Sequence, residues 1–258
     1  MPVYSRFQLN NKKQFFRMKL TVFVTGETLK KIAFLIKEKR MLQKMSLALL
    51  LVVSPIYAAS LVEYSGTPTE LKDTGKSMTD TGRVVKVFPS ASITKGKEKM
   101  DLKMTGSGIR WKTVAIMDVN VYAAANYLDA AVVMNKQNPI ESVGNSKGKV
   151  MHMTFFRSLT SKEIGDALKA ALEKNGVDLN APHLKNFFGQ FEFAMSPGET
   201  MTLIGTKLPN GEEELVLEAP GKVIKGQGKN LATDVWKGYL GIPVDKGLED
   251  LKNKLVGN

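Results

Sequence analysis

The sequence predicts one domain of α+β fold built on an antiparallel sheet. Short segments rich in β-branched and aromatic residues recur from Arg83 onward, bounded by glycine, proline or polar residues as strands are. Helical patterns come late in the chain and do not alternate regularly with the strands, which disfavours a parallel βαβ architecture. With 258 residues, 43% of them hydrophobic, the chain can form one substantial core.

The first half of the predicted domain consists mainly of strands. The first strand ends at Pro89, which cannot continue a sheet ladder. A short helix is expected over 129–135. The strands expected here, in chain order, are 84–88, 102–105, 113–119, 121–128 and 149–156.

The best helix pattern follows the last of these strands. Thr160 and Glu163 have the spacing of a capping box, in which each side chain satisfies a free backbone N–H near the helix start. Apolar residues then recur at helical spacing until Asn175-Gly176, which favours a stop. We therefore expect a helix over Ser161–Lys174.

The carboxyl-terminal third is expected to contain a hairpin followed by helices. Asn210-Gly211 supplies residues that tolerate positive φ, so the segments 200–207 and 213–218 are expected to pair antiparallel. The remaining expected elements are a strand at 222–226 and helices at about 183–193, 231–239 and 246–255.

The net charge of +12 is concentrated at the amino terminus. Residues 1–40 carry ten basic and two acidic side chains. The segment 41–59 then has a basic start, an uncharged apolar run and a small-residue end, the pattern of a secretory signal peptide cleaved after Ala58 or Ala59. Residues 1–40 form a basic extension before it. We expect the true start at Met41 or Met45, with residues 1–40 either misassigned sequence upstream of the start or an unusually long basic region of the signal peptide. The alternative is a cytoplasmic basic tail or an amphipathic surface helix.

Without residues 1–58 the basic and acidic side chains are nearly equal in number. From Ala59 onward the chain has 26 basic and 23 acidic residues, a net charge of +3. The expectations are therefore a periplasmic or secreted protein with no nucleic-acid partner and no stable membrane anchor after cleavage. Residues 60–82 are expected as a loose lead-in, and residues 83–258 as one domain.

The sequence offers no catalytic or metal-binding motif. It has no cysteine, which excludes disulfides, thiol catalysis and cysteine-ligated metals. His152 and His183 have no third ligand nearby in sequence, and the glycines near Gly106 and Gly226 lack the spacing of nucleotide-binding loops. We expect no metal and no cofactor.

Three blocks resemble the chalcone isomerase-like family, specifically its bacterial exported branch. They are Gly106-Ser-Gly-Ile-Arg110 with Val121-Tyr-Ala-Ala-Ala-Asn-Tyr-Leu128, then Met153-Thr-Phe-Phe-Arg-Ser-Leu-Thr160, and finally Val235-Trp-Lys-Gly-Tyr-Leu-Gly-Ile-Pro-Val-Asp245 with its terminal Leu255-Val-Gly257. The resemblance covers about residues 100–257. It implies an open-faced β-sandwich, a large antiparallel sheet with helices over one face and a ligand cleft between them.

The resemblance does not extend to the polar residues of the family's plant enzymes, which close a chalcone ring. Their arginine corresponds to Arg110, but their threonine, tyrosine, asparagine and later hydroxyl fall at Tyr122, Ile164, Ala171 and Gly238. Ile164 and Ala171 have no hydrogen bond to give. Chalcone isomerisation is therefore not expected.

The family's non-catalytic branch binds fatty acids through an arginine and a tyrosine, which implies a ligand-binding role for Arg110 and Tyr122. A guanidinium and a phenol together offer a carboxylate three donors. The alternatives are an exposed strand arginine and a core tyrosine. Apolar residues expected either to line the pocket or to form plain core are Ile109, Met117, Met153, Phe155, Ile164 and Leu168.

The leading hypothesis is an exported protein that binds a small hydrophobic carboxylate, such as a fatty acid, without chalcone isomerase activity. The alternative is an isomerase or intramolecular lyase on an enone-like substrate, with Arg110 polarising a carbonyl and Tyr122 donating a proton. A third class is a platform that binds a partner protein, whose identity the sequence does not indicate.

Overall fold

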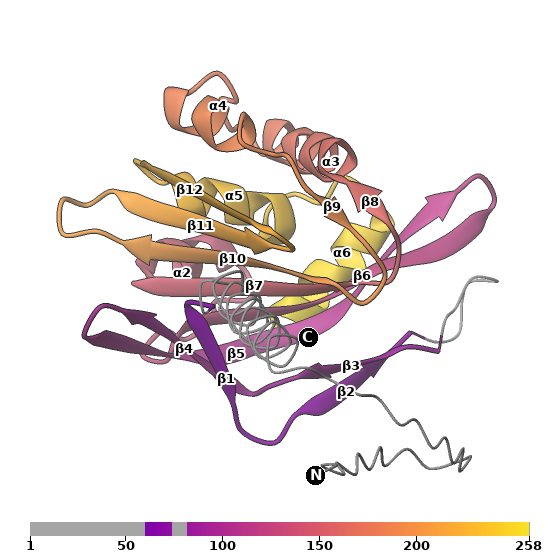
Figure 1. Ribbon diagram of the computed structural model, residues 1–258, viewed down its shortest axis with the longest axis horizontal. Helices are drawn as coiled ribbons and strands as arrows, with labels where there is room; N and C mark the ends of the chain where they lie inside the picture. Colours follow the sequence, from indigo (N-terminus) through magenta and orange to yellow (C-terminus); the bar gives the residue numbers. More distant parts are fainter. Residues whose placement is uncertain (1–59, 74–81, 258) are drawn as a thin grey trace, which may run out of the picture. The chain divides into compact units, whose positions relative to one another are not determined.

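The computed structural model describes residues 60–73 and 82–257, which lie within one folded unit (Figure 1). Within these residues the main element is an eight-stranded sheet whose neighbouring strands all run antiparallel. In spatial order its strands are β1 (Val62–Ser65), β4 (Ser90–Lys95), β5 (Glu98–Val114), β6 (Met117–Asp129), β7 (Gly148–Phe155), β10 (Thr200–Lys207), β11 (Glu213–Ala219) and β12 (Lys222–Gly228).

Helices cover one face of this sheet. Residues from all of them join alternate residues of the central strands in one buried apolar cluster, here called the helix-side core. The described helices are α2 (Pro139–Asn145), α3 (Ser161–Lys174), α4 (Pro182–Phe188), α5 (Leu231–Leu240) and α6 (Lys246–Leu255). The predicted α+β architecture, an antiparallel sheet with helices on one face, is confirmed.

Strands near the amino terminus cover the second face. β2 (Thr69–Lys72) and β3 (Val84–Val87) pair with each other, and Val85 and Val87 are buried against the sheet. The other alternate sheet residues, such as Ala123 and Ala125, complete this second-face core. A further short pair, β8 (Leu159–Thr160) with β9 (Ala194–Met195), leads into α3.

The expectation of a loose lead-in over residues 60–82 is wrong for the part that the structure describes. β1 is the edge strand of the main sheet, where Val62 pairs with Ile93 and is buried, and Thr69–Lys72 forms β2. These strands are short and polar, so their sequence has little periodicity. They form because the second face of the sheet carries apolar side chains that need cover.

The helix over Ser161–Lys174 is confirmed together with its capping box. Thr160 Oγ1 accepts from the Glu163 N–H at 3.2 Å, and the Thr160 N–H donates to Glu163 Oε2 at 2.8 Å. The hairpin at Asn210-Gly211 is also confirmed, since β10 and β11 pair antiparallel and Gly211 has a φ of 84°.

The strand expected at 102–105 is much longer, and the strand expected over 113–119 is wrong because that segment contains the turn between β5 and β6. β5 runs from Glu98 to Val114 through a lysine-rich stretch, because pairing with β4 and β6 outweighs its polar composition. The short helix expected over 129–135 is wrong. Asp129 ends β6, and the next helix starts at Pro139.

Two glycines in β5 let α6 lie directly on the sheet. A Cβ at Gly106 would come within 2.0 Å of the Lys254 carbonyl oxygen, and one at Gly108 within 2.7 Å of Lys254 Cβ. Only glycine permits this approach. Arg110 follows Gly108 by two residues on β5. The close packing therefore places the first turn of α6 beside Arg110.

The predicted basic extension (1–40) and signal peptide (41–59) lie outside the described residues. Across 60–73 and 82–257, none of the helices is both long and apolar enough to span a bilayer.

Candidate functional site

Arg110 lies on the helix side of the sheet, directly across from Tyr122. The two are Cα partners in the β5–β6 ladder, so their side chains project from the same face. Arg110 is 8% exposed. Tyr122 is partly buried and packs on the helix-side core, with its ring 5.5 Å from that of Phe155. The structure therefore brings the two predicted binding residues together.

One nitrogen of the Arg110 guanidinium is held by Asp245. Nη2 lies 2.5 Å from Asp245 Oδ2, while the other carboxylate oxygen accepts from the Leu248 N–H at 2.9 Å and caps α6. Asp245 therefore fixes the first turn of α6 to β5.

The other nitrogen has no partner among the described residues. Arg110 Nη1 is buried and makes no hydrogen bond within residues 60–73 and 82–257. Gly247 lies beside it, where a Cβ would come within 2.4 Å. A buried N–H group without an acceptor is unfavourable by about 1–3 kcal/mol, so this nitrogen marks a position suited to an acceptor from outside the chain.

Two phenols complete the cluster. Burial raises the pKa of Tyr122 to about 12, Arg110 lowers it in part, and Asp245 raises it again. Burial, with the nearby Tyr122, raises the pKa of Tyr239 well above its usual value. Both hydroxyls therefore keep their protons at neutral pH and can donate hydrogen bonds.

The chemistry available at this cluster favours binding over proton transfer. Neither histidine belongs to it: His152 bonds Thr202 on the second face at 2.9 Å, and His183 lies in α4. Tyr122, with a pKa of about 12, is a weak acid for catalysis at neutral pH. Among the described residues, no group of three metal-ligating side chains occurs.

The residues expected to line a pocket separate into three groups. Met153, Phe155 and Leu168 are buried in the helix-side core, and Ile164 packs against it. Ile109 packs on the second-face core, because neighbouring strand residues point to opposite faces, so its expected place beside Arg110 is wrong. Met117 is 41% exposed at the β5–β6 turn, far along the strand from Arg110, and is also misplaced.

Two of the positions aligned with the plant enzymes' polar residues, Ala171 and Gly238, serve packing in this chain. Ala171 is buried between α3 and the core, and a Cβ at Gly238 of α5 would come within 2.6 Å of Leu168 Cδ1. An open depression of about 530 Å³ lies elsewhere, at the β1–β4–β5 edge beside Tyr64, Pro89 and Lys103.

Sequence reasoning missed Asp245 as a partner of Arg110. Its position just before an apolar helical pattern is typical of an N-cap, and that role could be found locally. Its second partner lies 135 residues earlier, and no local pattern connects the two.

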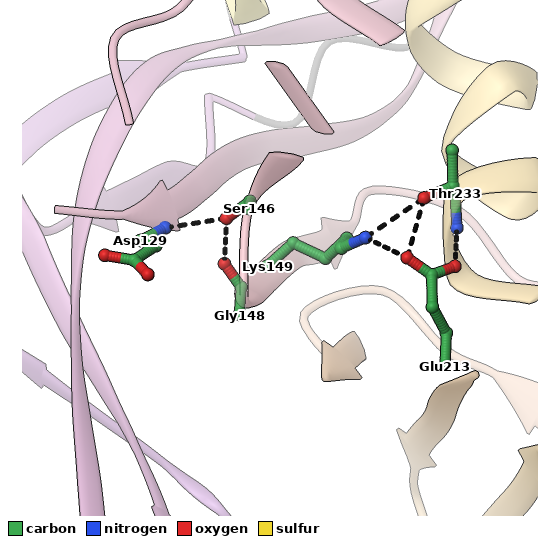
Figure 2. A network of polar contacts seen from close by, with 6 residues as sticks. All are labelled: Asp129, Ser146, Gly148, Lys149, Glu213 and Thr233. Atoms are coloured by element: carbon green, nitrogen blue, oxygen red, sulfur yellow. Dashed lines mark hydrogen bonds and ion pairs between the residues drawn. The ribbon is translucent and has the colours of Figure 1, made fainter. Parts of the chain in front are cut away.

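A second buried cation on the same sheet, Lys149, has two partners within the chain for its charged nitrogen (Figure 2). Lys149 of β7 is fully buried, and its Nζ lies 2.6 Å from Glu213 Oε1 and 3.1 Å from Thr233 Oγ1. Glu213 also accepts from the Thr233 N–H at 2.7 Å, in the first turn of α5. Gly205 leaves room for the lysine, since a Cβ there would come within 2.8 Å of Lys149 Cγ.

Three comparisons relate this chain to known proteins. A fatty-acid binding protein of Arabidopsis thaliana has a similar structure, with a TM-score of 0.45 and 16% identity over 64% of this chain and 95% of that one. None of the curated proteins matches the sequence. The model of the chalcone isomerase-like family matches residues 84–257, well over half of the chain, and the protein therefore belongs to the chalcone isomerase-like family.

Proposed function

We propose that this protein binds a small hydrophobic carboxylate, such as a fatty acid, with its acid group on Arg110 Nη1 and the Tyr122 hydroxyl. The observation that carries the proposal is the buried Nη1, which has no partner among the described residues and belongs to a guanidinium close to the Tyr122 phenol. A ligand oxygen would supply the missing acceptor. A charge-assisted hydrogen bond of this kind is stronger than one between neutral groups.

Asp245 prepares Arg110 for this role. Its carboxylate holds Nη2 and so fixes the plane of the guanidinium, while Nη1 keeps its hydrogen-bonding capacity for a ligand acceptor. The Asp245 side chain is 36% exposed, so water screens its repulsion of a bound acid. A site ordered before binding gains affinity because less freedom is lost on association.

The apolar part of the ligand would lie against the helix-side core. Tyr122 and Phe155 already contact each other there, and Met153 lies on the same face of the neighbouring strand. Methionine side chains adapt to ligands of varied shape. We therefore expect the site to accept acyl chains of more than one length, which binding experiments can measure.

We also propose export to the periplasm or the outside of the cell. The support is the basic, apolar and small-residue pattern of residues 41–59. The intact mass of the protein recovered from the producing cells tests this, since cleavage would leave a chain starting at Ala59 or Ser60.

The binding proposal is tested by titrating delipidated protein with fatty acids of increasing chain length and with their methyl esters. The ester keeps the chain but loses the charge, so we expect it to bind at least about tenfold more weakly than the acid. Equal affinity for acid and ester, or no binding of any acid, would contradict the proposal.

A further inference from the structure

The β5–β6 hairpin extends beyond the sheet as a two-stranded ribbon (Figure 1). β5 last pairs with β4 at Lys103, and β6 first pairs with β7 at Tyr122. Between these points, residues 111–120 have only each other as strand partners among the described residues. This segment, here called the ribbon, begins one residue after Arg110.

The end of the ribbon is apolar and exposed. Ile116 is 95% exposed, Val114 50% and Met117 41%, and with Ala115 they form what we call the apolar tip. Ala115 and Ile116 make a two-residue turn in which Ala115 has a φ of 57°. Two-residue turns normally use glycine, asparagine or aspartate, which tolerate positive φ. Neither the backbone conformation of the turn nor solubility therefore favours Ala115-Ile116 at this exposed position.

The ribbon changes in chemistry from its tip to its base. Behind the apolar tip, the Thr113 hydroxyl bonds Asp118 Oδ1 at 2.7 Å. Lys112 follows with an exposed side chain, and then Trp111, whose indole N–H lies 3.2 Å from Asp250 Oδ2. This order matches the layers of a bilayer. The aliphatic tip suits the acyl chains, and the polar groups, the lysine and the indole suit the headgroup region.

We propose that the apolar tip inserts into the outer part of a phospholipid bilayer. Two residue pairs of a strand span about 7 Å, within the roughly 5–10 Å to which interfacial segments enter a membrane. The turn then stays at interfacial depth, because free peptide groups are not tolerated in the hydrocarbon core.

The size and shape of the tip favour lipid over a partner protein. Stable protein interfaces bury about 800 Å² on each partner, and the four residues of the apolar tip, at a convex turn, cannot supply that area. A bilayer needs no complementary pocket. This inference does not depend on the Arg110 site, although Ile116 is six residues, or roughly 20 Å of strand, from Arg110.

The test uses a full-length Ile116→Trp variant and phosphatidylcholine vesicles with brominated acyl chains. Bromine quenches indole fluorescence only at close range, so quenching reports which part of the protein enters the lipid. The matched control is Val133→Trp, because Val133 is 88% exposed and lies beyond the opposite end of β6. Wild-type protein gives the background from Trp111 and Trp236.

We expect strong quenching at position 116 and background quenching at position 133. Adding Val114→Asp to the Ile116→Trp variant should raise the lipid concentration for half-maximal quenching at least about tenfold, since one apolar group no longer enters the bilayer. Adding Val133→Asp should leave it unchanged. Background quenching at position 116, or equal quenching at both positions, overturns the proposal even if residues 1–59 bind the vesicles.

Discussion

Arg110 and Lys149 are both buried cations on the helix side of one sheet, yet of the two only Arg110 has a buried nitrogen without a hydrogen-bond partner within the described residues. The Lys149 ammonium group has Glu213 and Thr233, and Glu213 in turn holds the start of α5 (Figure 2). Arg110 Nη2 has Asp245, whereas its Nη1 has no partner among residues 60–73 and 82–257. Each pair ties a helix to the sheet, but the Arg110 pair leaves a whole charged nitrogen without an acceptor in this part of the chain.

The difference separates a structural charge from a binding charge. Burial alone identifies neither, because both side chains are at most 10% exposed. A buried ion pair with all its hydrogen bonds made inside the chain fixes helix position and has nothing to offer a ligand. We therefore expect changes at Lys149 to affect stability and changes at Arg110 to affect binding.

The largest stability effect is expected for Lys149→Met. It leaves the Glu213 carboxylate buried without its cation, which should lower the free energy of unfolding by about 3–5 kcal/mol. In Lys149→Met/Glu213→Gln no charge is buried and the glutamine oxygen can still accept from Thr233, so much of the loss should be recovered. Urea denaturation measures both. A loss below about 1 kcal/mol for the single variant would show that the pair is not a structural element.

Gly247→Ala should cost about 1–3 kcal/mol, because the new Cβ would overlap the Trp111 carbonyl oxygen at 2.0 Å and force the first turn of α6 away from β5. Asp245 would then move off Arg110. The control is Gly144→Ala in α2, whose Cβ would meet only Thr233 Cγ2 at 4.0 Å. If both alanine variants unfold at the same urea concentration, the first turn of α6 does not pack against β5 at Arg110 as described.

Acid should weaken the Lys149 pair. Burial opposes ionisation of Glu213, but Lys149 and the Thr233 donors outweigh it and lower the pKa of this carboxyl below its usual value of 4.5. A carboxyl with a lowered folded pKa contributes stability above pH 4.5 that is lost as pH falls through the folded pKa. Unfolding free energies measured from pH 6 to pH 3 should therefore fall more steeply for the wild type than for Lys149→Met/Glu213→Gln. Parallel curves would contradict this assignment.

Arg110→Met should change stability least, by about 1 kcal/mol or less. Asp245 is partly solvated and keeps its bond to the Leu248 N–H, and the unpartnered Nη1 is removed as well. Thermal or urea unfolding checks this. A loss as large as that of Lys149→Met would make Arg110 a structural residue and remove the contrast between the two cations.

The local parts of this account were predictable from sequence. The capping box of α3 and the turn at Asn210-Gly211 each depend on residues a few positions apart, and both patterns gave the observed elements. The family resemblance placed Arg110 and Tyr122, and the structure puts them opposite each other.

The remaining features depend on contacts distant in sequence. Asp245 meets Arg110 across 135 residues, and Glu213 meets Lys149 across 64. The facing of Ile109 follows from the β-sheet register, which composition does not reveal. β1 and β2 form because a sheet face needs cover, although their own sequences show little periodicity.

The most direct test of the central claim compares fatty-acid affinity in two folded variants by isothermal titration calorimetry. Arg110→Met should bind at least about tenfold more weakly than the wild type because the acid loses its charged donor. Lys149→Met/Glu213→Gln, measured well below its midpoint temperature of unfolding, should bind as the wild type does. If Arg110→Met binds normally, or if the Lys149 double variant loses binding to the same extent, the unpartnered guanidinium nitrogen is not the ligand site.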